Sequence, residues 1–357
     1  MAQSILIIGA GIVGASLAFL LARHGATVTV LEAATPASAA SGCSFGWINA
    51  SFYVNPAHHH LRVAAMAAHH RLAALMPGHA PNWQGTLWYE DQAAGMDKLA
   101  ADLAALGYPV TQLHRADVVR LEPQLARPPN RALHFPTESA VDATSLTRGL
   151  LAASGAQLRT GVAATSLIET AGQVTGARTD AGHFHADHTV VATGVGTPAL
   201  LATLGLDLPM RHRPGMMIYT KPVGWRLNHI HVTPEQEIRQ DRNHAVLSPG
   251  VANHQADASE TIDDPNAVAA ATVARLRGLF NAPELQLDRW AVSRRPVPGD
   301  GLPLIGAVQP GLSLAVMHSG VTLAALSAEA LAAEIAGQGT QSALADFRPN
   351  RLLKPML

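Results

Sequence analysis

The stretch Ser4-Ile-Leu-Ile-Ile-Gly-Ala-Gly-Ile-Val-Gly14 decides how the first part of this 357-residue chain folds. Its apolar run predicts a buried strand, and the following Ala15-Ser-Leu-Ala-Phe-Leu-Leu-Ala-Arg-His24 predicts a helix. The glycines between them predict a tight turn that brings the helix N-terminus close to a bound phosphate. We therefore expect the backbone of five residues to hold a pyrophosphate: Gly9, Gly11, Ile12, Val13 and Gly14.

A second apolar run, Thr27-Val-Thr-Val-Leu31, ends in Glu32, 18 residues beyond Gly14. An acid at the end of the second strand of such a unit accepts hydrogen bonds from the adenosine ribose and disfavours a 2′-phosphate. Three glycines after a strand can also be simple turn residues, so the acid and the second strand carry the argument. The sequence predicts a dinucleotide site with Glu32 and Ala33 at the ribose.

Composition limits the other classes of function. Hydrophobic residues make up 48% of the chain and charged residues 14%, which is enough apolar material for a sizeable core. The length suggests two domains, or one domain with a large insertion. A net charge of −1 without any basic cluster gives no indication of nucleic-acid binding.

The single cysteine, Cys43, cannot form an internal disulfide, as is usual in a reducing compartment. The eighteen histidines lack the spacing and partners of a metal site, so we expect no metal and assign them to the surface and to helix caps. The first strand begins too early for a signal peptide, and charged residues interrupt the apolar stretch 312–335. The sequence thus predicts a cytoplasmic protein without a transmembrane segment.

Small and hydroxyl residues follow the ribose-binding acid in quick succession between residues 33 and 51. This segment suits either a flexible loop or an extended stretch beside a pyrophosphate and under a flat ring, and we favour the second interpretation. A later buried strand, His188-Thr-Val-Val-Ala-Thr-Gly194, ends where only small residues let the backbone approach a cofactor. The additional cofactor contacts that we expect are Ser41, Gly42, Ser44, Phe45, Gly46, Val162, Thr193 and Gly194.

Periodicity predicts the elements of the rest of the chain. Helices are expected over residues 56–75, 91–106, 116–121, 143–154 and 265–279, and strands over 83–88, 157–159, 162–168, 216–220, 228–232, 237–239 and 245–247.

These motifs together resemble a known family. GAGIVG with Glu32, VVATG at 190–194, RRPVPGDGLPLIG at 294–306, HSGVTLAAL at 318–326 and DFRPNRL at 346–352 are similar to the FAD-dependent D-amino-acid oxidase, glycine oxidase and sarcosine oxidase superfamily. The resemblance implies an α/β fold with a discontinuous Rossmann-type FAD-binding domain and a smaller substrate domain with a mostly antiparallel sheet over the flavin. The expected division is 1–80, 138–209 and 290–357 for FAD, and 81–137 and 210–289 for the substrate.

The choice of FAD over NAD depends on the late strand and turn that feed a final helix from about Val321. A helix N-terminus aimed at flavin N1 and the C2 carbonyl stabilises the negative charge of the reduced ring. The alternative is one more strand and helix of the sheet. Sarcosine oxidases attach their flavin to a cysteine near this segment, and the absence of one here implies non-covalent FAD. The further contacts expected are Asp300, Gly301, Ser319, Gly320, Val321 and Thr322.

Arg295 is the residue that the resemblance assigns to the substrate. In the family, the arginine of an Arg-Pro pair five residues before Asp-Gly grips the substrate carboxylate, and Arg295 has this position. A structural salt bridge, or Arg294 as the true anchor, are the alternatives. Tyr219 and His231 are expected to line the pocket, against ordinary packing in the sheet.

The implied reaction is hydride transfer from the substrate Cα to flavin N5, giving an imino acid that hydrolyses. The alternatives are a flavin dehydrogenase of a hydroxy acid that uses an acceptor other than oxygen, and a non-enzymatic FAD- or NAD-binding module. The only lysines are Lys98, Lys221 and Lys354, so oxidase and dehydrogenase both stay open. Substrate side chain, stereochemistry, and monomer versus homo-oligomer are also open.

Overall fold

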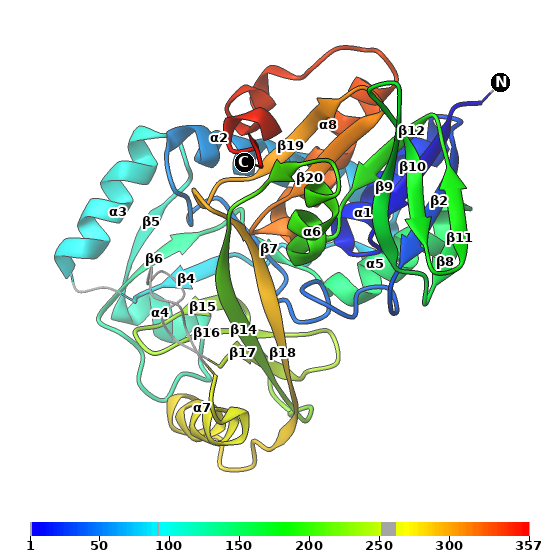
Figure 1. Cartoon of the computed structure of the whole chain (residues 1–357). Helices are drawn as coiled ribbons and strands as arrows, with labels where there is room; N and C mark the ends of the chain where they lie inside the picture. The colour runs from blue at the N-terminus through cyan, green and yellow to red at the C-terminus, as the bar shows by residue number, and fades with distance from the viewer. Residues whose placement is uncertain (1, 91–92, 251–261, 357) are drawn as a thin grey trace.

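Two large sheets organise the molecule, as the computed structural model in Figure 1 shows for residues 2–90, 93–250 and 262–356. The first has six strands in the order β19-β20-β12-β1-β2-β8, and the second has eight in the order β18-β14-β17-β16-β15-β4-β6-β5. A three-stranded sheet, β11-β10-β9, lies beside the first. This mixed architecture confirms the predicted α/β fold.

The six-stranded sheet is parallel from β20 to β8, and β19 pairs antiparallel to β20. Alternate residues of its central strand enter two different cores. Ile5 and Ile7 pack with residues of α1, α5 and α8, whereas Leu6 and Ile8 pack with the three-stranded sheet and α6. Because both faces are covered, β1 is apolar along its length. The strands of the six-stranded sheet are β1 (Ser4–Ile8), β2 (Thr27–Glu32), β8 (Gln157–Thr160), β12 (His188–Val191), β19 (Leu304–Gln309) and β20 (Leu312–Val316).

The eight-stranded sheet joins two separate parts of the chain. All its pairs are antiparallel except β4 with β15, where Leu87 lies opposite His231. The long strands β14 and β18 pair along their whole length and run down to α7 in Figure 1. Its strands are β4 (Thr86–Trp88), β5 (Thr111–His114), β6 (Arg131–Phe135), β14 (Met210–Thr220), β15 (Ile230–Val232), β16 (Glu237–Gln240), β17 (Val246–Pro249) and β18 (Leu287–Pro298).

The helices begin and end where local signals place them. α2 starts after Asn55, whose side chain accepts a hydrogen bond from the backbone N–H of His58 at 2.9 Å, and α5 ends at Gly155 in a left-handed conformation. Both match the predicted ranges, while residue 91 at the start of the third predicted helix lies outside the described residues. The helices are α1 (Ile12–Arg23), α2 (Pro56–Leu75), α3 (Ala93–Ala105), α4 (Arg115–Leu121), α5 (Ala143–Ser154), α6 (Thr197–Ala202), α7 (Pro265–Phe280) and α8 (Gly320–Ile335).

The remaining strands are short or belong to small sheets: β3 (Trp47–Ile48), β7 (Ser139–Ala140), β9 (Ala164–Thr170), β10 (Gln173–Thr179), β11 (Gly182–His185), β13 (Leu206–Asp207) and β21 (Lys354–Pro355). Residue 290, where we expected a change of domain, lies inside β18, which stays paired with β14 to Pro298. Within the described ranges, no helix is long and apolar enough to cross a membrane.

Candidate active site

A cavity of about 610 Å³ lies between the two large sheets. It opens at the carboxyl ends of β1, β2, β12 and β20, which is where open parallel sheets bind their ligands. One face of the eight-stranded sheet forms the opposite wall. Its volume lies in the range of cofactor and ligand sites, roughly 300 to 1,000 Å³.

The glycine turn at one end of the cavity excludes side chains by geometry. Gly9 has φ of 107°, and a Cβ there would lie 2.6 Å from the carbonyl oxygen of Ala192. A Cβ on Gly14 would lie 2.0 Å from the carbonyl oxygen of Gly9, so Gly14 serves close packing and is not among the residues that line the cavity. The other predicted contacts of the turn, Gly9, Gly11, Ile12 and Val13, do line it.

Glu32 lines the same end of the cavity, with Ala33 beside it and Val162. Its carboxylate accepts hydrogen bonds from the backbone N–H groups of Ala10 at 2.8 Å and Ala34 at 2.9 Å. These two bonds hold the acid at the end of β2. Contact between Glu32 and the adenosine ribose stays a prediction.

The segment from Ser41 to Gly46 runs along the cavity, as predicted. Ser41, Ser44, Phe45 and Gly46 line it, and Ser41 Oγ accepts a hydrogen bond from the Ile12 N–H at 2.9 Å. Gly42 does not line it, because this residue forms a turn in which a Cβ would lie 2.1 Å from a carbonyl oxygen.

Cys43 lies in this segment and lines the cavity as well. Its thiol donates a hydrogen bond to the carbonyl oxygen of Ala291 on β18, with an Sγ–O distance of 3.1 Å. Burial raises the pKa of the Cys43 thiol to about 11, so the thiol is protonated at neutral pH.

The N-terminus of α8 also lines the cavity, with Gly320 close to Val13 of the glycine turn. Ser319, Gly320, Val321 and Thr322 all line it, as do Thr193 and Gly194 after β12. Ser319 has φ of 58°, and its side chain does not cap the helix. The dipole of α8 therefore favours a negative charge in this part of the cavity.

Asp300 and Gly301, which we predicted to contact the cofactor, do not line the cavity. Asp300 instead accepts a hydrogen bond from Arg351 Nε at 2.7 Å and one from the Leu302 N–H at 3.0 Å. This pair shapes the connection between β18 and β19.

Arg62 is a cavity residue that the sequence analysis missed. Its guanidinium is buried, with the side chain only 1% exposed, and donates to the Asn49 backbone oxygen at 2.9 Å, Asn49 Oδ1 at 2.6 Å and Ser319 Oγ at 2.8 Å. Burial lowers its pKa to about 10, so the group is cationic at neutral pH. The sequence did contain a signal for Arg62. It lies four residues after His58 and seven before His69, so the three polar side chains share one face of α2, and this face is buried.

Arg295 lies on β18 opposite Arg213 of β14, and it lines the cavity together with Arg294. Its side chain crosses over Gly215, with Nε 2.8 Å from the position that a Cβ on this glycine would occupy. In the part of the chain that the structure describes, no carboxylate forms an ion pair with Arg295. The alternative of a structural salt bridge therefore has no support in the described residues.

The cavity-facing side of the eight-stranded sheet follows from strand register. Residues directly opposite each other share a face, and so do residues two apart along a strand. Met217, Pro249 and Glu237 lie in one row across β14, β17 and β16, and Gly215, Ser293 and Arg295 lie on the same face. All six line the cavity. Glu237, 4% exposed, was predicted only as part of a strand.

Tyr219 and His231 do not line the cavity, contrary to our expectation. Tyr219 is covered by the segment from Ser41 to Gly46, because its hydroxyl donates to the Gly42 carbonyl oxygen at 3.2 Å, and the Arg289 guanidinium lies 3.6 Å from its ring centroid. Glu237 pairs with Val232, the residue next to His231 on β15. Because neighbouring residues of a strand point to opposite faces, His231 points to the face away from the cavity.

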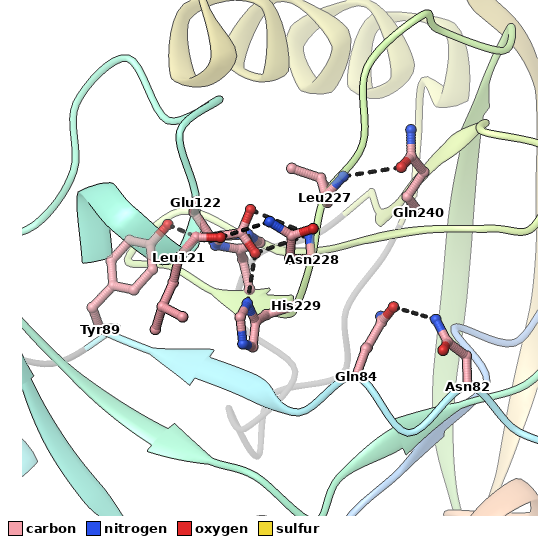
Figure 2. A network of polar contacts seen from close by, with 10 residues as sticks. Asn82, Gln84, Tyr89, Leu121, Glu122, Leu227, Asn228, His229 and Gln240 are labelled. Atoms are coloured by element: carbon pink, nitrogen blue, oxygen red, sulfur yellow. Dashed lines mark hydrogen bonds and ion pairs between the residues drawn. The ribbon is translucent and has the colours of Figure 1, made fainter. Parts of the chain in front are cut away.

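On that other face, Glu122 organises a buried polar network with the neighbouring strand (Figure 2). Its carboxylate accepts a hydrogen bond from His229 Nδ1 at 2.7 Å and one from the Asn228 N–H at 3.0 Å. His231 Nε2 lies 3.6 Å away, and its Nδ1 is 3.3 Å from the Tyr89 hydroxyl. His231 thus contributes to packing on the face away from the cavity.

Residues 4–334 match the sequence model of the DAO family, whose description is FAD dependent oxidoreductase. The chain therefore belongs to this family of FAD-dependent flavoproteins, as the motifs predicted, and FAD is the cofactor of the family.

Individual relatives are more distant. The chain is 26% identical over 391 residues to the bifunctional protein ThiO/ThiG of Trichormus variabilis, which covers 99% of this chain and 56% of that protein. It is 29% identical over 287 residues to the D-amino acid dehydrogenase of Cereibacter sphaeroides, covering 76% of this chain and 65% of that protein. The chain thus spans a little over half to about two thirds of these relatives. The glycine oxidase structure from Geobacillus kaustophilus shares the fold, with a TM-score of 0.84 at 21% identity over 97% of this chain and 98% of the other.

Proposed function

We propose that the protein oxidises the C–N bond of an amino acid or secondary amino acid, giving an imino acid that water then hydrolyses. The observation that carries this proposal is the Arg295 guanidinium in the cavity wall, on the sheet face opposite the dinucleotide turn. A planar guanidinium with two parallel donors suits a carboxylate. Similarity to a D-amino acid dehydrogenase and a glycine oxidase supports the same substrate class.

The residues that line the cavity suit the successive parts of FAD. The turn from Gly9 to Val13 would hold the pyrophosphate, Glu32 the ribose, and the segment from Ser41 to Gly46 the ring system. At Gly9 and Gly14 a Cβ would strike the backbone, so these glycines let β1, the turn and α1 pack closely, which brings the backbone of the turn to the cavity. When bound without a covalent link, FAD supplies the acceptor for the hydride that leaves the substrate Cα.

The substrate wall orients the reacting carbon and excludes water. Arg295 would grip the carboxylate, while Met217 and Pro249 present apolar surface beside it. Because a neutral amine supplies the electrons that expel the hydride, the residues need only bind and orient the substrate. The cationic Arg62 and the partial positive charge of the α8 N-terminus lie close together in the cavity wall and favour an anionic product of the transfer.

The cellular setting is part of the proposal. A single half-buried thiol without a disulfide partner suits a reducing compartment, and we propose a cytoplasmic location. Oxygen and another electron acceptor are both compatible with the cavity.

The test compares three ligands with one carbon skeleton: an amino acid, the matching 2-hydroxy acid and the decarboxylated amine. Each is mixed anaerobically with FAD-loaded protein, and bleaching of the visible flavin band is followed. The amino acid should bleach the band fastest. Faster bleaching by the hydroxy acid would replace the proposal with the alternative dehydrogenase. Reoxidation with oxygen or with a dye then separates oxidase from dehydrogenase.

The same assay with Arg295→Leu tests the carboxylate contact. We expect a loss of roughly 2 to 5 kcal/mol in kcat/KM for amino acids and a far smaller loss for the decarboxylated amine. Arg295→Lys should recover part of the loss, because lysine restores the charge without the two-pronged geometry. Arg294→Leu tests the alternative anchor, which also lines the cavity, and it should reduce kcat/KM for amino acids far less. Equal losses for both ligands would make Arg295 structural.

A further inference from the structure

Arg62 is the largest side chain among those almost completely buried, and a buried cation needs an explanation. Its three hydrogen bonds go to neutral oxygens of Asn49 and Ser319. Among the described residues, no carboxylate lies within the 4.0 Å of an ion pair. Its charge is therefore held mainly by dipoles, in the wall of the cavity that it lines.

The other ionisable groups on the same side of α2 do not add to this charge. His58 and His69 have pKa values lowered by burial to about 3 and about 4, so both are neutral at pH 7. Burial also lowers the pKa of His59. Arg62 is thus the cation that this face of the helix carries at neutral pH.

Glu138 is the acid whose charge acts on Arg62, and it has other hydrogen-bond partners. Glu138 is fully buried and accepts hydrogen bonds from Trp47 Nε1 at 3.0 Å, the Tyr108 hydroxyl at 3.0 Å and the Ser51 N–H at 3.2 Å. Burial raises the pKa of Glu138 and so disfavours its ionised form. The attraction between Glu138 and Arg62 compensates the buried charge only in part.

Ser319 connects Arg62 to α8, whose N-terminus lines the cavity. The serine stands immediately before α8 in a left-handed conformation with φ of 58°, which is uncommon for a residue with a Cβ. Its hydroxyl accepts from Arg62 at 2.8 Å, so the guanidinium holds this residue in place. The positive charge and the positive end of the α8 dipole consequently lie close together in the cavity wall.

We propose that Arg62 acts as the positioning and electrostatic residue that sets the reduction potential of the bound flavin. A hydride brings two electrons and one proton to a neutral ring, so reduction adds one negative charge. A fixed cation in a site of low dielectric stabilises this charge, and with it the reduced form. The inference rests on the proposed FAD site.

The experiment measures the two-electron potential of FAD-loaded protein by equilibration with a reference dye, and sulfite binding by bleaching of the oxidised flavin. Sulfite adds negative charge to the oxidised ring and thus reports the local positive charge without turnover. Arg62→Met should weaken sulfite binding at least tenfold. It should also lower the reduction potential by about 30 mV, which for a two-electron couple corresponds to a tenfold change in the equilibrium constant of reduction.

Two variants separate charge from structure. Arg62→Lys keeps the charge but cannot make three hydrogen bonds, so its potential should stay near that of the unmodified protein although its Tm falls. Arg71→Met is the matched control, because Arg71 lies on the same helix and also contacts α8 through Glu329, at 2.6 Å, but with its side chain 56% exposed. Its potential should not change.

Several outcomes would overturn the inference. If Arg62→Met and Arg62→Lys shift the potential equally, the residue supports structure only. If neither shifts it while FAD stays bound and amino acids still reduce it, the inference fails and the proposed function stands. If the unmodified protein binds no FAD, both fail together.

Discussion

The Arg295 side chain lies across Gly215, with its Nε 2.8 Å from the point that a Cβ on the glycine would occupy. Gly215 lies on β14 and has no positive φ, so the backbone conformation does not require glycine here. The missing side chain instead leaves room for the Arg295 side chain. The glycine thereby sets the direction in which the guanidinium enters the cavity.

Gly215→Ala should therefore displace Arg295 while leaving the sheet intact. We expect KM for amino acids to rise about tenfold, equivalent to about 1.4 kcal/mol, with FAD content and Tm nearly unchanged. Steady-state kinetics with an amino acid and its decarboxylated amine measure the effect. Gly224→Ala, where a Cβ would meet nothing within 4 Å, is the control. Unchanged KM values would show that Arg295 adapts without loss.

Glu32 should contribute to FAD affinity through the adenosine half alone. Glu32→Ala should weaken FAD binding by about 1.5 to 3 kcal/mol for each charge-assisted hydrogen bond lost. Titration of apoprotein with FAD, followed by flavin fluorescence, measures this change. FMN lacks the adenosine, so its affinity should not change. Equal weakening of both flavins would instead reflect loss of the bonds to Ala10 and Ala34 that hold the turn.

Cys43 should leave the flavin unattached, although it lines the cavity. Its protonated thiol donates to the Ala291 carbonyl, so the reactive thiolate is scarce at neutral pH. Acid precipitation of purified protein should release all yellow colour into the supernatant, with Cys43→Ala behaving identically. Flavin that remains with the precipitated wild-type chain but not with the variant would show a covalent link.

Because of Glu122, the free energy of unfolding should depend on pH in the acidic range. Burial opposes ionisation of this carboxylate, but its hydrogen bonds from His229 and its neighbours outweigh burial and hold the pKa at about 2 in the folded protein, below the usual 4.5. The stabilisation is therefore complete above pH 4.5 and is lost as the pH falls toward 2. Its size is on the order of 3 kcal/mol.

Urea unfolding at pH 7 and at pH 3 measures this contribution. Glu122→Gln should lower the free energy of unfolding at pH 7 and reduce its dependence on pH. The exposed Glu235, substituted as Glu235→Gln, is the control. If the Glu122→Gln variant keeps the full pH dependence, carboxylates other than Glu122 are responsible for it.

Local patterns were enough to predict the elements nearest the cofactor. The turn from Gly9 to Gly14 and the start of α2 after Asn55 depend on neighbours within a few residues, so their sequence signals are complete. The place of Glu32 at the end of β2 could be predicted for the same reason, whereas its ribose contact stays a prediction. Motif similarity added Arg295, whose place in the cavity wall agrees with the expectation.

The errors concern residues whose orientation depends on distant strands. His231 turns away from the cavity because of the register of β15 with β4 and β16, and β4 comes from a part of the chain more than 140 residues earlier. Arg62 was missed because a helical pattern shows which face of α2 is buried but not what that face contacts. Its contact is with Ser319, 257 residues later in the chain. Such pairings arise from tertiary packing, which composition and spacing do not encode locally.

The wall of the cavity is built from parts of the chain made at very different times. The glycine turn is synthesised first, whereas β20 and α8, which also line the cavity, follow about 300 residues later. Domains fold as units, and the six-stranded sheet is complete only when β19 and β20 have been made. The full wall around a whole flavin can therefore form only after α8 has been synthesised.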